Sequence, residues 1–145
     1  MQNESAIIKI MESFEIRNSS EPIEHALVIL KNGNVYECVG SETGVMVDTI
    51  FGKNLKGAYI SHNHPIKETG YTFSDEDVNL FKLYDINVLR GVDEKYVYQL
   101  TRNSKEIDEM GDWQTEETFL HNIMIVKAKQ YGIGYRRWKN DKRTS

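Results

Sequence analysis

The chain has 145 residues and a formal net charge of −4; 39% of its residues are hydrophobic and 28% are charged. This length and balance fit one folded domain with a single core, and they exclude a disordered chain and an overall polycation. No apolar run approaches the ~20 residues that span a membrane. Cys38 is the one cysteine, so no intramolecular disulfide can form, and residues 1–5 lack the basic start of a secretory signal. We therefore expect a cytoplasmic protein that does not associate with membranes.

Apolar periodicity and turn residues predict helices and strands in a mixed order. The expected helices are residues 4–14, 45–51, a helix that begins at Ser74, and 115–131. The expected strands are residues 23–30, 34–40, 56–64, 86–92 and 96–101. Asn32-Gly33 joins the first two strands and is typical of a hairpin with a type I′ turn, in which both central residues have positive φ. This order indicates an α+β fold, a mixed sheet with helices on its faces.

The last expected helix has a regular apolar spacing, and Gly132 ends it. The face that we expect it to bury contains Phe119, Ile123, Val126 and Gln130. The segment that follows is rich in arginine and lysine. We expect one domain over residues 1–134 and a solvated basic tail over residues 135–145, which could also contact nucleic acid.

Two histidines stand two positions apart at the end of the strand expected over residues 56–64. Side chains alternate between the faces of a strand, so His62 and His64 point to the same face. Pro65 cannot donate a ladder hydrogen bond and disfavours helix at His64, which ends the strand there. The strand thus delivers two potential ligand nitrogens for a metal ion to the rim of a sheet. A His-X-His pair by itself is more often structural, so a metal site requires further residues from elsewhere.

Asp77 is the best candidate for a third ligand, because it lies in the first turn of the helix that begins at Ser74. The helix dipole favours a carboxylate at that position. Two nitrogens and one oxygen form a ligand set that hydrolytic zinc sites use, with a further position open for water. The segment from Ser74 to Asp77 is also typical of an ordinary helix N-cap with acidic residues in its first turn. The two interpretations are compatible.

These residues together resemble a known signature. His62-Asn63-His64-Pro65, followed by Ser74 and Asp77, is similar to the JAMM metalloprotease motif of the MPN/JAB superfamily, and closest to its RadC-like and phage or prophage branch. That family also has a glutamate on an early strand, and Glu24 stands at the matching position. The resemblance covers about residues 21–101. It implies an MPN/cytidine-deaminase-like mixed sheet flanked by helices.

The resemblance also implies a role for each motif residue. His62, His64 and Asp77 would hold a Zn²⁺ ion, and Glu24 would act as general acid and base on the water bound to it. Ser74 would donate a hydrogen bond to the oxyanion of the reacting carbonyl. The implied reaction is hydrolysis of a peptide or isopeptide bond in a peptide or protein substrate.

Two features depart from the family pattern. Ser74 follows His64 by ten positions, two more than is usual, which places two extra residues in the loop near Glu68. No glycine follows Glu24 closely, which disfavours a ubiquitin-like substrate.

Four neighbouring residues are weaker candidates. Glu21 competes with Glu24 for the role of base but precedes Pro22, outside the expected strand, and Glu68 could approach a metal or substrate from its loop. His25 faces the opposite side of its strand from Glu24, and His121 has no partner at ligand spacing.

Two other functions remain open. A RadC-like DNA-associated protein is supported by the basic tail and by the His-Asn-His-Pro variant. A non-catalytic MPN-type scaffold would require none of the five motif residues.

Overall fold

The computed structural model describes residues 3–41, 45–65 and 69–141 and has the expected α+β fold. The helices are α1 (Glu4–Asn18), α2 (Val47–Phe51), the 3₁₀ helix η1 (Gly52–Leu55), α3 (Asp75–Leu83) and α4 (Glu116–Tyr131). The strands are β1 (His25–Ile29), β2 (Val35–Val39), β3 (Tyr59–Asn63), β4 (Val88–Val92), β5 (Tyr96–Thr101) and β6 (Gly134–Lys139).

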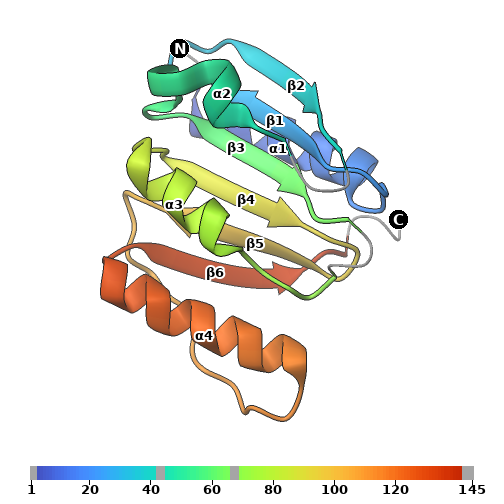
Figure 1. Cartoon of the computed structure of the whole chain (residues 1–145), viewed down its shortest axis with the longest axis vertical. Helices are drawn as coiled ribbons and strands as arrows, with labels where there is room; N and C mark the ends of the chain where they lie inside the picture. The colour runs from blue at the N-terminus through green and yellow to red at the C-terminus, as the bar shows by residue number, and fades with distance from the viewer. Residues whose placement is uncertain (1–2, 42–44, 66–68, 142–145) are drawn as a thin grey trace.

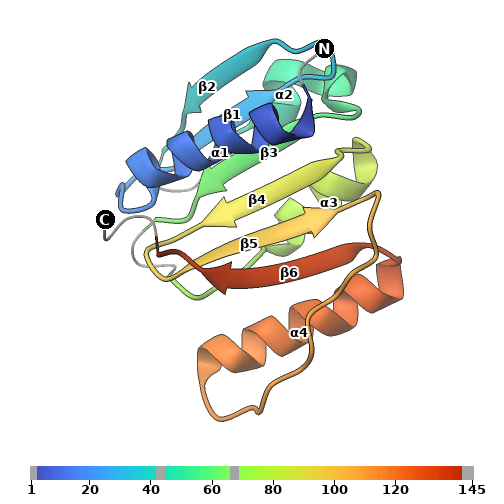
Figure 2. The same cartoon turned by 180° about the vertical axis from the view of Figure 1, so that it is seen from behind.

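The six strands form one mixed sheet in the order β2-β1-β3-β4-β5-β6. Only β3 and β4 pair in parallel, and every other neighbouring pair is antiparallel. A parallel pair requires a crossover, which α3 supplies between the two strands. Figures 1 and 2 show α2 and α3 on one face of the sheet, α1 on the opposite face and α4 along the β6 edge.

The alternation of side chains along β1 and β3 divides the core between the two faces. Ala26, Val28 and Ile60 pack on the side of α2, α3 and α4, whereas Leu27 and Tyr59 pack against α1. The same alternation places His62 on the α3 side and Ser61 on the α1 side. On that α1 side, Ser61 donates to the buried Glu15 over 2.7 Å, and Glu15 also pairs with Arg90 at 3.1 Å. Strand β3 is therefore buried on both faces of the sheet.

The β1–β2 hairpin is confirmed, but its turn is not type I′. Among the described residues, those with positive φ other than glycine are Thr72 and Asp85, so Asn32 has negative φ, and only Gly33 of the pair is positive, at 93°. Gly33 N–H donates to the Leu30 carbonyl, and Leu30 N–H donates to the Asn34 carbonyl. These bonds define a three-residue loop in which glycine occupies the position with positive φ.

The expected tail over residues 135–145 is wrong for its first part, because residues up to Lys139 form strand β6 beside β5. Tyr135 is fully buried, and the Arg137 guanidinium lies 4.2 Å from the centre of the Tyr96 ring. The arginines and lysines of this segment suggested a solvated chain end. Cations are also common on edge strands, where they discourage pairing with other chains. Residues 142–145 lie outside the described residues.

The buried face expected for the last helix is also wrong. Phe119 and Val126 are 47% and 41% exposed. The residues of α4 that are buried are His121, Asn122, Met124, Ile125 and Ala128. Because α4 packs beside β6, which was not expected as a strand, the face that it buries could not be placed from apolar spacing alone.

His121 takes part in a buried hydrogen-bond chain between α4 and the sheet. Its Nδ1 lies 2.8 Å from the Tyr135 hydroxyl, which lies 3.0 Å from the Thr72 hydroxyl. Burial and the nearby charge of Arg137 lower the pKa of His121 to about 4. The neutral imidazole is therefore the form that the fold accommodates.

We expect His121→Asn to reduce the loss of stability on acidification. In the unfolded chain a histidine has a pKa of about 6.5, so between roughly pH 6.5 and pH 4 the unfolded state binds more protons and wild-type stability falls. Asparagine can still bond to Tyr135 but does not titrate. Urea unfolding at pH 7 and pH 5 measures the difference, and an equal loss in both proteins would contradict this assignment.

Candidate metal centre

The candidate centre lies where β3 ends at the edge of the sheet, beside the start of α3. His62 is in β3, and His64 continues the ladder beyond it by donating its N–H to the Val92 carbonyl over 2.7 Å. The two side chains therefore reach the same face, as the sequence predicted. Figure 1 shows α3 crossing the sheet on this face.

The structure brings His62, His64 and Asp77 together, with one ligand atom of each lying within 4.8 Å of the others. The two histidine Nε2 atoms are 3.2 Å apart, and His62 Nε2 lies 3.5 Å from Asp77 Oδ1. Ligand atoms held about 2.0–2.2 Å from a tetrahedral metal ion lie roughly 3.3–3.5 Å apart. The spacing of these donors therefore fits a bound metal ion.

The two carboxylate oxygens of Asp77 have different partners, one in the helix cap and one in the candidate metal centre. Its Oδ2 accepts the Ser74 N–H over 3.1 Å, and the Ser74 hydroxyl accepts the Asp77 N–H over 3.1 Å, which completes a capping box. Its Oδ1 faces His62. The cap thus holds the carboxylate in place. The helix cap is confirmed, and the position of Asp77 also suits a metal ligand.

The ring of His64 fits a space that its neighbours leave for it. A Cβ atom at Gly91, the residue that pairs with His62 across the sheet, would lie only 2.8 Å from His64 Nε2. Tyr98 stacks on the ring, with centroids 5.9 Å apart, and its hydroxyl donates to the buried Asp93 over 2.9 Å. His64 Nδ1 is buried without a hydrogen-bond partner among the described residues. Packing and the contact of its Nε2 with His62 therefore orient this ring.

The charges in the centre act on one another strongly. Burial would lower the pKa of His62, but Asp77, with a smaller contribution from Glu24, raises it to about 9. Burial and the charge on His62 lower the pKa of His64 to about 4. Although burial opposes ionisation of Asp77, the two histidines hold its pKa well below the usual range. Without metal, the centre holds one imidazolium and one carboxylate, an arrangement in which a cation can replace a proton.

Glu24 comes to the centre from the start of β1. Ala26 pairs with His62, so extending the antiparallel register by two residues places Glu24 opposite His64 and on the same face. The backbone of Glu24 also continues the ladder toward β2, through bonds to Ser41 and Gly40. Its influence on the pKa of His62 agrees with this placement.

Asn63 lies between the two histidines and holds the segment around Glu24. Its Oδ1 accepts the His25 N–H over 2.5 Å, and its Nδ2 donates to the carbonyls of Ile23 at 2.9 Å and Glu21 at 3.4 Å. Asn63 is fully buried. One side chain therefore fixes the backbone on both sides of Glu24 relative to the strand that bears the histidines.

The other sequence candidates have different positions. Ser74 is exposed at the helix start and uses its hydroxyl in the cap. His121 bonds to Tyr135, outside the metal group. His25 lies in β1, where alternation turns it away from the α3 side. Glu68 lies outside the described residues.

Sequence reasoning included Asn63 in the motif but assigned no role to Asn63, Gly91 or Asp93. A glycine inside an expected strand signals the close approach of another group, so Gly91 could have been found from the sequence. Asp93 accepts hydrogen bonds from Gly70, Lys95, Tyr96 and Tyr98, which joins the loop before α3 to the β4–β5 turn. No local sequence pattern indicates that one carboxylate will bond to two separate segments of the chain.

Comparisons with protein-family models, with curated proteins and with solved structures find no match to this chain. Within the described residues, every helix is too short or too polar to traverse a lipid bilayer. Function is therefore inferred from the chemistry of the site itself.

We expect divalent metal ions to raise the melting temperature of the wild-type protein and to have little effect on Asp77→Asn. An asparagine can still accept the Ser74 N–H and keep the cap, but it removes the anionic ligand. A ligand at a hundredfold excess over its Kd stabilises by about 2.7 kcal/mol. Thermal unfolding with Zn²⁺, Mn²⁺ and Mg²⁺ measures the shift. Glu76→Gln, an exposed acid of the same helical turn, is the control and should respond as wild type does.

We expect Asn63→Ala to lower the free energy of unfolding by several kcal/mol, since each buried group left without a partner costs about 1–3 kcal/mol. Asn63→Asp retains an acceptor for His25 but faces two carbonyl oxygens without a donor, so it should also be destabilised. Urea unfolding measures both variants against Asn34→Ala, an exposed control. A change within 0.5 kcal/mol, the usual range for surface positions, would show that the hydrogen bonds of the Asn63 side chain do not stabilise the fold.

Proposed function

We propose that this protein is a zinc-dependent hydrolase that cleaves a peptide or isopeptide bond. The observation that carries the proposal is the convergence of two imidazole nitrogens and one carboxylate oxygen within 4.8 Å of one another, with two of the three pairs at 3.2 and 3.5 Å, beside a glutamate at the start of the neighbouring strand. The resemblance of these residues to the JAMM motif supports the same chemistry.

Zinc is the metal that this ligand set suits best. A set of two imidazoles and one carboxylate is used by hydrolytic zinc enzymes, which keep a further position for water. When bound, the ion supplies Lewis acidity and lowers the pKa of a coordinated water to about 7.

The protein's own residues would move the proton and orient the site. Glu24 would take a proton from the attacking water and deliver it to the leaving amine, which its place on the α3 side of the sheet allows. Asn63 would hold Glu24 at a constant position against the ligand strand. Ser74 would serve chiefly by fixing Asp77, because its hydroxyl already accepts the Asp77 N–H. The hydroxyl hydrogen remains free to donate to a substrate oxyanion.

The basic segment on which the nucleic-acid alternative rests is in part strand β6. Arg137 stacks on Tyr96, whereas Arg136 lies 3.8 Å from Glu106 and remains exposed. A scaffold would not require the converging donors.

We expect Glu24→Gln to bind zinc as the wild type does and to lose roughly 10²–10⁴-fold in peptide hydrolysis, the usual contribution of a general acid or base. Zinc content by mass spectrometry and cleavage of an unbiased peptide library measure the two properties separately. Glu21→Gln is the matched control, since Glu21 is the nearby rival acid and should be dispensable. A zinc-loaded wild type that cleaves no peptide in the library would refute the hydrolase, and equal activity of Glu24→Gln would refute the role of Glu24.

A further inference from the structure

Two adjacent cavities lie at the end of the sheet opposite the metal centre. The larger has a volume of about 690 Å³ and is lined where β3 begins, at Tyr59, and just before β4, at Asn87. The smaller has a volume of about 400 Å³ and lies over the β1–β2 turn and η1. They share Leu30, Lys31 and Lys56. The proposed hydrolase chemistry uses none of these residues.

The smaller cavity is strongly cationic, although the chain as a whole carries −4. Its described lining has no carboxylate and contains three lysines, Lys31, Lys53 and Lys56, and three asparagines, Asn32, Asn34 and Asn54. None of these ammonium groups forms an ion pair with a described residue, whereas other lysines of the chain, such as Lys95 and Lys127, do. Unpaired cations beside amide groups are the usual surroundings of a bound anion.

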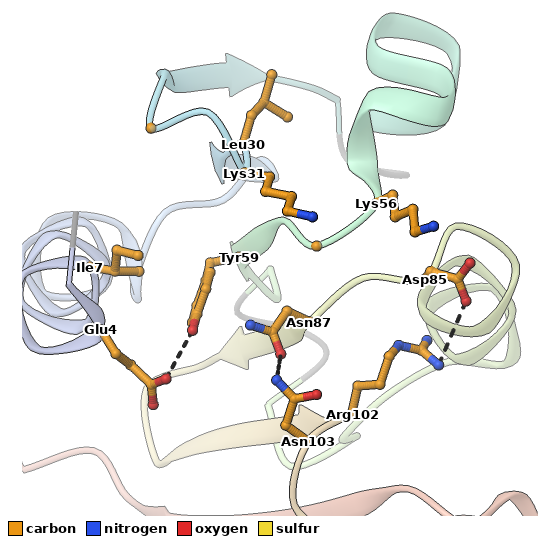
Figure 3. Close-up of a pocket in the computed structure, with 12 residues that line it drawn as sticks. Glu4, Ile7, Leu30, Lys31, Lys56, Tyr59, Asp85, Asn87, Arg102 and Asn103 are labelled. Atoms are coloured by element: carbon orange, nitrogen blue, oxygen red, sulfur yellow. Dashed lines mark hydrogen bonds and ion pairs between the residues drawn. The ribbon is translucent and has the colours of Figure 1, made fainter. Parts of the chain in front are cut away.

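The acidic residues of the larger cavity are already engaged. Glu4 accepts the Tyr59 hydroxyl over 3.0 Å, and Asp85 lies 3.8 Å from Arg102. Arg102 itself donates to the carbonyls of Ile86 and Phe81 and so secures the end of α3. Figure 3 shows both pairs at the rim of the cavity. Glu4 keeps its negative charge, because a tyrosine hydroxyl does not neutralise it, whereas the cations of the cavity without an ion pair to a described residue are the shared lysines.

Two hydrogen-bonded pairs line the larger cavity. Asn103 donates to Asn87 over 3.0 Å, and the Tyr59 hydroxyl donates to Glu4. Figure 3 shows both pairs, with the buried side chain of Ile7 near Glu4 and Tyr59. An aromatic ring, an aliphatic side chain and oriented amides together suit a compact ligand body that carries hydrogen-bonding groups.

The backbone also shapes the position of Lys31. Gly57 has a φ of 77°, and a Cβ atom there would approach Lys31 Cδ to 3.3 Å. The aliphatic part of Lys31 thus lies against the glycine, and both Lys31 and Lys56 line the cavity. Figure 3 shows the ammonium group of Lys31 directed toward Lys56, whose own ammonium group points toward Asp85. This support reduces the freedom that the lysine must lose when it binds a ligand.

We propose that the two cavities bind a small molecule that bears two or more phosphate groups, of the chemical class of the nucleoside di- and triphosphates. The phosphates would lie among Lys31, Lys53 and Lys56, and the body of the molecule would lie against Tyr59 and Asn87. The volumes are those of small-molecule sites, about 300–1,000 Å³. The cations form one concave cluster rather than the stripe along a surface that a nucleic-acid polymer follows, which favours a small ligand.

Isothermal titration of the full chain with ATP, ADP, AMP and inorganic triphosphate tests the proposal. EDTA keeps the protein free of metal, so the result does not depend on the hydrolase proposal. We expect ATP to bind more tightly than ADP and AMP. We also expect it to bind more tightly than inorganic triphosphate, which lacks the nucleoside that would lie against Tyr59 and Asn87. The double variant Lys31→Gln/Lys56→Gln should weaken ATP binding roughly tenfold or more, because two charge-assisted contacts are removed.

A matched control separates a site from general charge attraction. Lys105→Gln/Lys129→Gln removes the same two charges from exposed positions that line neither cavity and should leave the affinity unchanged. Absence of ATP binding at millimolar concentration, or equal weakening in both double variants, would overturn the proposal. Inorganic triphosphate binding as tightly as ATP would overturn the placement of the ligand body. A single-stranded oligonucleotide that binds more tightly than ATP would overturn the choice of a small molecule.

Discussion

The buried side chain of Asn63 connects the two halves of the candidate centre. It stands between both histidines and binds the backbone on either side of Glu24 through three hydrogen bonds. The backbone of Glu24 is bonded to Ser41 and Gly40 on the β2 side, and Asn63 supplies the bonds that tie this segment to β3. Because every buried polar group needs a partner, the amide and the segment it holds stabilise each other. Asn63 thus helps to set the distance between the candidate ligands and the candidate base.

The parallel pairing of β3 with β4 sets the position of the third ligand. The connection between these two parallel strands must bring the chain back to the end of the sheet where β4 begins. Helix α3 lies in this connection and crosses one face of the sheet. The helix therefore starts over the end of β3, where the histidines lie. Its N-terminal turn carries Asp77, held by the capping box. Local helix chemistry and sheet topology thereby cooperate to place one carboxylate.

Opposite ends of the same strands have opposite electrostatic character. Glu24 and Asp77 act on the histidines where β3 ends, whereas lysines without described partners surround the cavities where β3 begins. Because the strand is short and buried on both faces, the two ends are separate surfaces joined by a rigid element. A cationic ligand and an anionic ligand can therefore be held by one small domain without competing for the same groups.

The sequence alone determined the elements whose signals are local. His62 and His64 at strand spacing, the stop at Pro65, the Ser74 cap and the glycine hairpin could all be predicted, because each depends on neighbouring residues. Tertiary structure alone decided the rest. Residues 134–139 became an edge strand because β5 offered a free edge, and α4 then buried His121 rather than Phe119. The roles of Asn63, Gly91 and the paired cavities also depend on contacts between segments far apart in the chain, which no local pattern encodes.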